Sequence, residues 1–144
     1  MLPRLRLMLT LLLLVGCQDA PPSVVPPDPL PAGVLLPPGM PNDKWFYDNV
    51  LRSEVPVLVD FSATWCQPCL AMKPALEEIQ KAYGNRLTVV EIDVDEHAYV
   101  ADHFRANRIP RLMLIQKGVI EADAGGQRSY YEIINVLKPT IGRP

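Results

Sequence analysis

Short apolar runs along the chain mark its predicted strands. Residues 56–61 and 87–94 are nearly continuous apolar runs rich in β-branched side chains, as is typical of strands buried on both faces. Residues 111–116 form a third run, and residues 119–122 form a fourth after the turn at Lys117-Gly118. The last two strands are close enough in sequence to form a hairpin.

Apolar positions three or four residues apart mark the predicted helices. Asn42 or Asp43 can cap the first helix. Ser129 and Glu132 have the spacing of a capping box, which predicts the start of the last helix. The predicted helices cover 42–51, 71–83, 96–104 and 129–138, the last of them stopping at Pro139.

The order of these elements predicts the fold class. A strand, a helix and a second strand in succession favour parallel pairing of the two strands, whereas the hairpin pairs its strands antiparallel. We therefore expect an α/β protein with a mixed central β-sheet flanked by helices.

Residues 1–16 have the layout of an export signal. Arg4 and Arg6 precede an apolar run over 7–15, which is shorter than the roughly 20 residues that cross a bilayer. The sequence LVGC that ends at Cys17 resembles the bacterial lipoprotein signal, in which the cysteine after the cut is lipidated. The resemblance implies an anchor at Cys17 to a membrane of the bacterial cell envelope, with the protein facing the periplasm or the exterior. An ordinary cleaved signal is the alternative.

Residues 17–41 form a predicted linker, and residues 42–144 form the predicted domain. Between positions 18 and 41, nine of 24 residues are proline, and neither a helical nor a strand period is present. Pro-rich chains favour extended geometry at about 3.1 Å per residue, so this segment could hold a domain up to roughly 75 Å from the anchor. We expect it to act as a tether.

Composition and charge narrow the functional classes. With 144 residues and 49% hydrophobic content, the chain has room for one domain with a substantial core, and we expect a monomer. The formal charge of -2 provides no basic surface for phosphate groups, which argues against nucleic acid as a partner. Export would place the cysteines in an oxidising compartment, where a pair of them can form a disulfide.

Residues 65–69 (WCQPC) carry the strongest chemical signal. Two thiols three positions apart, between a predicted strand and a helix, are typical of a redox site. A structural disulfide is one alternative, although a four-residue loop would gain only about 2 kcal/mol. Haem attachment would need histidine where Leu70 stands. A zinc site with His97 and His103 is another alternative, but at a spacing far beyond that of zinc fingers. We expect no metal, and no cofactor other than the redox-active disulfide.

The two thiols have different predicted roles. A helix that begins at the cysteines presents free N–H groups and its positive dipole end to Cys66, which favours the thiolate and makes Cys66 the predicted nucleophile. Cys69 lies one turn further on the same helix side, where it can attack a mixed disulfide at Cys66 and release the product. Pro68 fits the first helical turn, because the N–H that proline lacks has no intrahelical partner there.

Residues 60–69 (DFSATWCQPC) resemble the active-site segment of the thioredoxin family. The similarity covers about residues 42 to 140. Further matches lie at the proline that kinks the active-site helix, at the Ile-cis-Pro pair and at two later glycines; in this sequence they are Pro74, Ile109-Pro110, Gly118 and Gly126.

This resemblance implies the other half of the site. Pro110 should be cis and face the cysteines, although the residues alone would favour a trans bond, since only about 5–6% of X-Pro bonds are cis. Ile109 should expose backbone groups that pair with an extended substrate, and Trp65 and Pro68 should border the same substrate-binding surface. Asp60 should be buried behind the cysteines with a raised pKa and accept the proton of the second thiol. A capping role for Asp60 is the alternative.

The sequence departs from the family pattern around this site. Glu91 stands where thioredoxin has a lysine that pairs with the buried acid, so we expect it to tune the pKa of Asp60, unless it turns towards solvent. Arg111 replaces a threonine beside Pro110, and we expect it to bind substrate and select acidic partner surfaces. Ser62 and Leu70 replace a tryptophan and a lysine, and these changes should also surround the groove.

Together, these observations predict a thiol–disulfide oxidoreductase of the cell envelope that reduces protein disulfides. An oxidase or isomerase is one alternative, and a non-catalytic tethered binding module is another. The resemblance implies a membrane thiol transporter as the electron donor, and oxidised envelope proteins or apocytochrome c as possible substrates.

Overall fold

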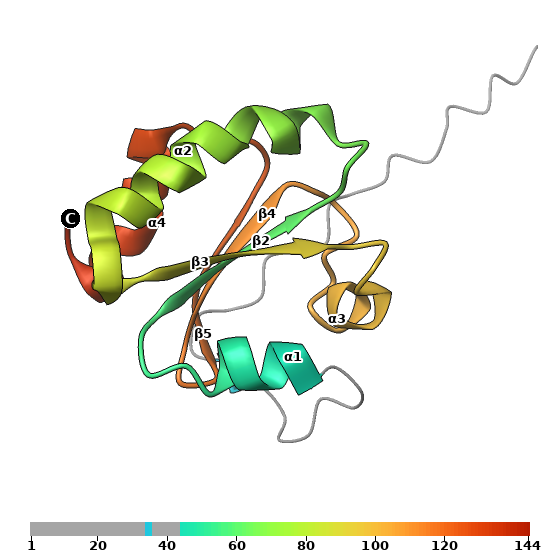
Figure 1. Ribbon diagram of the computed structural model, residues 1–144, viewed down its shortest axis with the longest axis horizontal. Helices are drawn as coiled ribbons and strands as arrows, with labels where there is room; N and C mark the ends of the chain where they lie inside the picture. Colours follow the sequence, from blue (N-terminus) through green and yellow to red (C-terminus); the bar gives the residue numbers. More distant parts are fainter. Residues whose placement is uncertain (1–33, 36–43) are drawn as a thin grey trace, which may run out of the picture.

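A mixed five-stranded sheet forms the centre of the protein, whose computed structural model describes residues 34–35 and 44–144 (Figure 1). The strands lie in the order β1-β5-β4-β2-β3. β2 and β3 pair in parallel, and the other neighbouring strands pair antiparallel. Their bounds are β1 (Val34–Leu35), β2 (Val57–Ser62), β3 (Thr88–Asp93), β4 (Arg111–Gln116) and β5 (Val119–Gly125). The predicted signal peptide, Cys17, Asn42, Asp43 and most of the predicted linker lie outside the described residues.

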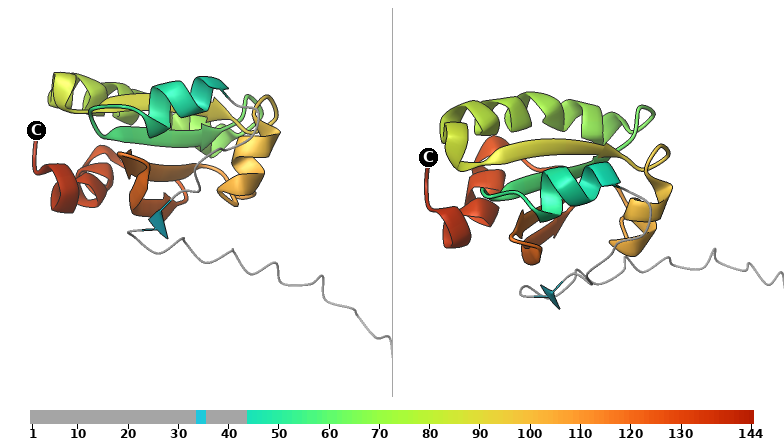
Figure 2. Two further views of the ribbon diagram at one scale, coloured as in Figure 1. Left: turned by 90° about the horizontal axis from the view of Figure 1, so that it is seen from below. Right: turned by 60° about the horizontal axis from the view of Figure 1, so that its bottom comes forward.

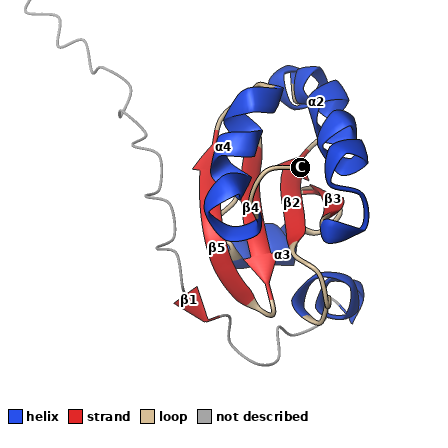
Figure 3. Cartoon of the chain, turned by 90° about the vertical axis from the view of Figure 1, so that its left-hand side faces the viewer, coloured by secondary structure: helices blue, strands red, loops and turns tan. Residues whose placement is uncertain are grey.

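Helices cover both faces of this sheet, as Figures 2 and 3 show. α2 and α4 lie on one face, and α1 and α3 lie on the other. The bounds are α1 (Lys44–Phe46), which continues into a π-helical turn (Tyr47–Leu51), α2 (Gln67–Tyr83), α3 (Ala98–His103) and α4 (Tyr130–Ile141). The predicted α/β class with a mixed, helix-flanked sheet is confirmed.

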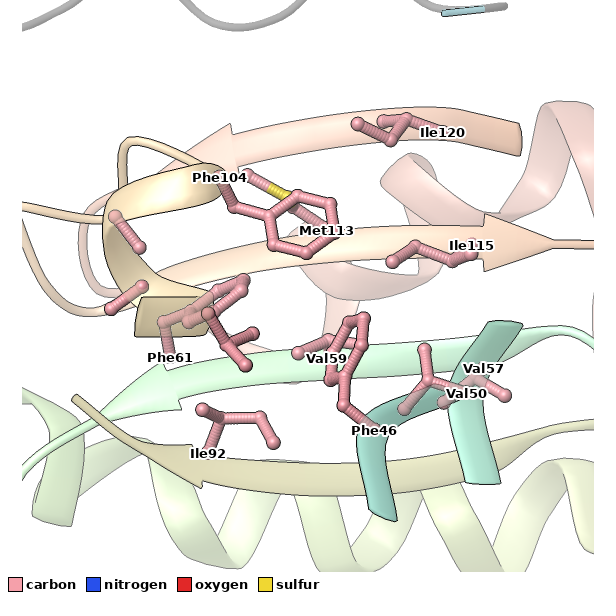
Figure 4. Packing of buried hydrophobic residues seen from close by; sticks show 13 residues of the cluster. Phe46, Val50, Val57, Val59, Phe61, Ile92, Phe104, Met113, Ile115 and Ile120 are labelled. Atoms are coloured by element: carbon pink, nitrogen blue, oxygen red, sulfur yellow. The ribbon is translucent and has the colours of Figure 1, made fainter. Parts of the chain in front are cut away.

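Strand β2 supplies side chains to both hydrophobic clusters. Val59 and Phe61 pack in the cluster beneath α1 and α3 (Figure 4), whereas Leu58 packs beneath α2 and α4. Successive side chains of a strand point to opposite faces, so Asp60 shares the α2 face with Leu58. This alternation places one carboxyl group inside an otherwise apolar layer, directly beneath the helix that carries the cysteines.

The predicted local motifs at the hairpin and at the last helix are confirmed. Lys117 and Gly118 adopt φ angles of 50° and 74°, the left-handed conformation that a two-residue hairpin turn requires. Ser129 and Glu132 form the capping box, in which the Ser129 N–H donates to Glu132 Oε2 at 2.8 Å.

Element boundaries differ from the sequence prediction in several places, of which β1 and the end of α4 are the most informative. Val34–Leu35 lies within the predicted linker but pairs with β5. This strand was not predicted, because two residues are too few to show a strand period. α4 continues through Pro139 to Ile141. Proline removes one backbone hydrogen bond from a helix, and here the loss falls in the last turn, where Gly142 N–H still donates to Lys138 O.

Among residues 44–144, no helix is both long enough and apolar enough to cross a membrane.

Candidate active site

The site is built at the start of α2, where Cys66 and Cys69 form a disulfide. Cys66 is the N-cap residue, and its Sγ accepts a hydrogen bond from Cys69 N–H at 3.3 Å. The helix therefore points a free N–H and its positive dipole end at the Cys66 sulfur, which would stabilise a thiolate there after reduction. Cys69 is fully buried, whereas Cys66 keeps 4% of its surface exposed and is the thiol that a partner can reach.

The loop before β4 contributes the second half of the site. The Ile109–Pro110 peptide bond is cis, as the resemblance implied. Ile109 packs against a small cluster that contains Ala63 and both cysteines. Gly126 N–H donates to Pro110 O at 2.8 Å, which ties the loop after β5 to this turn. Two segments about 40 residues apart in sequence thus meet at the disulfide.

Trp65 borders the site on its solvent side and is 63% exposed. Its indole Nε1–H donates to Asp95 Oδ2 at 2.7 Å, which fixes the orientation of the ring. Trp65, Val94 and Ile109 line a pocket of about 200 Å³, and Val94 and Ile109 also pack against the cluster that contains both cysteines. Pro68 lies in the first turn of α2 and is exposed, as predicted. The partnership with Asp95 was not predicted, because no local spacing relates two residues thirty positions apart.

Asp60 is almost completely buried, at 1% exposure, and neither carboxylate oxygen has a hydrogen-bond partner among the described residues. Burial raises its pKa, the Glu91 charge raises it further and the Lys73 charge lowers it, which together bring it to about 7. A capping role does not fit, because no hydrogen bond from the part of the chain that the structure describes reaches this carboxylate. At neutral pH the group is poised to take up or release a proton.

Glu91 lies beside Asp60 in the parallel β2–β3 pairing, but its side chain is 47% exposed. Its carboxylate bonds Lys73 Nζ through both oxygens, at 2.8 and 2.9 Å. Both expectations for Glu91 are thus partly met, since the side chain reaches solvent and its charge still acts on Asp60. Lys73 was missed in the sequence, although its position one turn after Cys69 on the same helix side could have indicated it.

Arg111 does not take the position that its sequence context suggested. The side chain is 5% exposed, and its guanidinium forms a double hydrogen bond with Asp123 at 2.9 and 2.5 Å. A third hydrogen bond runs from Nη1 to Arg105 O at 2.6 Å. Because these bonds occupy it within the fold, the predicted contact of Arg111 with acidic substrates is wrong. Ser62 is likewise buried and cannot border a groove, whereas Leu70 is exposed as expected.

His97 and His103, which were weighed as ligands only in the alternative of a zinc site, have other surroundings. The His97 ring lies 6.0 Å from the Trp45 ring, and His103 packs edge-on against Phe104 at 5.2 Å between ring centroids. Within residues 44–144, no group of three or more His, Cys, Asp or Glu side chains is arranged to hold a metal ion.

Comparison with known proteins agrees with this geometry. The family model described as thioredoxin matches residues 39–139. Thioredoxin from Acidithiobacillus ferridurans is 41% identical over 96 residues, which cover 67% of this chain and 89% of that protein. Thioredoxin from Synechocystis sp. is 40% identical over 100 residues, or 69% of this chain and 86% of that protein. A bifunctional thioredoxin reductase/thioredoxin from Mycobacterium leprae is 47% identical over 77 residues, which are only 17% of its length.

The two cysteines can pass between a dithiol and a disulfide with the exchange of two electrons, at a helix end that stabilises the attacking thiolate. With this pair at Cys66 and Cys69, the chain is a thiol–disulfide oxidoreductase and belongs to the thioredoxin family.

Proposed function

We propose that this protein reduces disulfides of other proteins in the bacterial cell envelope, to which Cys17 anchors it. The observation that carries the proposal is the meeting of Cys66, the more accessible sulfur at a helix N-terminus, with the cis Ile109–Pro110 turn. The turn offers backbone to an extended chain directly beside the reactive sulfur, and recognition of backbone suits a catalyst with many protein substrates.

In the proposed reaction, the reduced protein attacks its substrate in two steps. The Cys66 thiolate attacks one sulfur of the substrate disulfide, forms a mixed disulfide and releases the other substrate sulfur as a thiolate. Cys69 then loses its proton to Asp60 and attacks the Cys66 sulfur. This second step forms the Cys66–Cys69 disulfide and releases the second substrate thiolate, so two electrons pass to the substrate.

Exposed apolar groups around the sulfurs support contact with protein substrates. Trp65 and Leu70 are 63% and 38% exposed, and they flank the Cys66–Cys69 segment in the sequence. The pocket between Trp65 and Ile109 has room for about one side chain of the substrate next to the disulfide that is reduced. Burial of such apolar surface in the mixed-disulfide complex would favour association.

Turnover needs a dithiol that reduces Cys66–Cys69 again. The Mycobacterium leprae relative is named as a reductase and a thioredoxin in one chain, and this chain is similar to only 17% of its length. For a protein outside the cytoplasm, we infer that a membrane thiol donor supplies the electrons. The redox-active disulfide is the only cofactor that the proposal requires.

The proposed location rests on the N-terminal sequence. A lipidated Cys17 would bury several acyl chains, each methylene contributing about 0.8 kcal/mol to membrane binding. The Pro-rich segment that follows would let the domain reach substrates away from the membrane.

Trapping of mixed disulfides tests this function. In Cys69→Ser the second step is blocked, so substrate proteins should accumulate on Cys66 in the bacterial envelope and be identified by mass spectrometry. Cys66→Ser is the matched control and should trap far fewer proteins. Fractionation of cells that carry Cys17→Ser tests the anchor. This variant should be found in the soluble fraction instead of the membrane fraction.

Each alternative gives a different result in this experiment. A tethered binding module would trap no proteins through Cys66. An oxidase would accumulate substrates whose cysteines are reduced in cells that lack the protein. A Cys17→Ser variant that stays in the membrane fraction would contradict the lipid anchor.

A further inference from the structure

Asp60 lies at a cavity of about 400 Å³ between α2 and β3. Lys73 and Glu91 border the same cavity, Lys73 from the helix and Glu91 from the strand. Because the Asp60 carboxyl group is buried and has no hydrogen-bond partner among the described residues, this cavity is where its proton can meet water.

The Lys73–Glu91 ion pair joins the two walls of the cavity. Both carboxylate oxygens of Glu91 lie within 2.9 Å of Lys73 Nζ, and the two side chains are 41% and 47% exposed. The hydrogen bond from Lys73 to Glu91 raises the pKa of Lys73, so the ammonium stays charged. The pair thus borders the same cavity as buried Asp60 and is itself partly exposed to solvent.

We propose that Lys73 is a positioning residue for disulfide exchange, which holds Glu91 across the cavity and offsets its negative charge so that Asp60 can release its proton at neutral pH. The inference rests on the proposed function, in which Asp60 takes the proton of Cys69. Per turnover, one proton moves from the Cys69 thiol to the Asp60 carboxylate and then to water in the cavity. The electron pair of the former S–H bond forms the bond to the Cys66 sulfur.

The charges around Asp60 give the expected direction of each effect. Glu91 on β3 raises the pKa of Asp60, and Lys73 on α2 lowers it. Glu77 and Lys81 border the cavity further along α2, and Asp93 on β3 acts on Lys73. On the β4 side, the residue paired with Asp60 is apolar Leu112. No other cation acts on Asp60 as Lys73 does, within residues 44–144.

A titration of the Asp60 carboxyl group by NMR, in the oxidised full chain, tests the role of Lys73. Lys73→Met removes the positive charge that favours ionised Asp60 and leaves the negative charge of Glu91 without compensation. The midpoint of the Asp60 titration should therefore rise by about one pH unit. Glu91→Gln should lower it, and Lys73→Met/Glu91→Gln should return it towards the wild-type value. Lys73→Arg keeps the charge and should rescue the single variant.

Turnover provides the second readout. If Asp60 is half ionised at pH 7 in the wild type, a rise of about one unit in its titration midpoint leaves roughly a tenth of the Asp60 carboxyl groups ionised in Lys73→Met. The kcat of this variant at pH 7 should therefore be about fivefold lower than that of the wild type. The loss should disappear at higher pH, as a general loss of stability would not. Lys81→Met is the matched control, because it removes a lysine from the same helix and cavity but should leave midpoint and kcat unchanged.

The two readouts separate this inference from the proposed function. A Lys73→Met midpoint equal to that of the wild type, or an equal rise in Lys81→Met, overturns the inference even in an active reductase. A wild-type protein that reduces no protein disulfide overturns the proposed function, while the NMR midpoint still decides whether Lys73 controls the proton affinity of Asp60.

Discussion

At the scale of single residues, Asp60 is the group outside the cysteines to which the proposed mechanism assigns the proton transfer. Its burial could be predicted, because it lies within a run, residues 56–61, whose other positions are apolar. Its charged neighbours could be predicted only in part, since the adjacent strand pairing that brings Glu91 to it follows from the fold, whereas the bond to Lys73 depends on two flexible side chains. Sequence patterns carry little information on such side-chain positions.

The pKa of Asp60 predicts how stability depends on pH. A folded-state pKa of about 7, against an ordinary pKa of 3.8 for an aspartate side chain, means that the folded protein holds this proton more tightly than the unfolded chain. The stabilisation is therefore fully present below about pH 4 and is lost as the pH rises to about 7, by roughly 4 kcal/mol in total. The unfolding free energy of Asp60→Asn should not fall in this way. The difference in unfolding free energy between Asp60→Asn and the wild type should therefore shift in favour of the variant as the pH rises from about 4 to about 7.

Urea denaturation of the oxidised protein across this pH range measures the effect. Glu78→Gln, a change of an exposed carboxylate on α2, is the charge-matched control. A difference between wild type and Asp60→Asn that stays constant from pH 4 to 7 would contradict the assigned proton affinity.

At the scale of elements, the strands and helices followed from apolar periodicity, and their pairing followed from their order. Arg111 shows where this reasoning stops. The strand that begins at Arg111 was predicted, but its side chain was expected to face a partner beside Pro110, whereas the neighbouring strand β5 places Asp123 diagonally opposite Arg111. The resulting buried ion pair depends on the register between two strands, which the sequence does not specify residue by residue.

The ion pair between β4 and β5 should be a point of high sensitivity. Arg111→Met would leave the Asp123 carboxylate buried without its guanidinium partner, and we expect a loss of about 3–5 kcal/mol in unfolding free energy. Arg111→Met/Asp123→Leu removes both charges and should recover much of this loss. Urea denaturation of both variants checks the prediction. A single variant as stable as the wild type would show that the pair contributes nothing.

At the scale of the whole molecule, the family, the fold and the two reactive thiols could be predicted, because the motif at residues 65–69 is local and the cis proline turn resembles a known pattern. The arrangement that makes the site work is not local. It brings together the start of α2, the loop before β4 and the end of β2, and only the folded chain shows which side chains meet.

The reduction potential of the Cys66–Cys69 disulfide tests the central claim most directly. Proteins of this fold range from about -270 mV for thioredoxin to about -120 mV for a strong oxidant, a difference of roughly 7 kcal/mol for two electrons. Equilibration of the full chain with glutathione or dithiothreitol buffers, read by the mass of alkylated thiols, gives the value. A reductase of protein disulfides should lie near the thioredoxin end of this range. A potential near -120 mV would contradict the account, because such a protein would oxidise its partners.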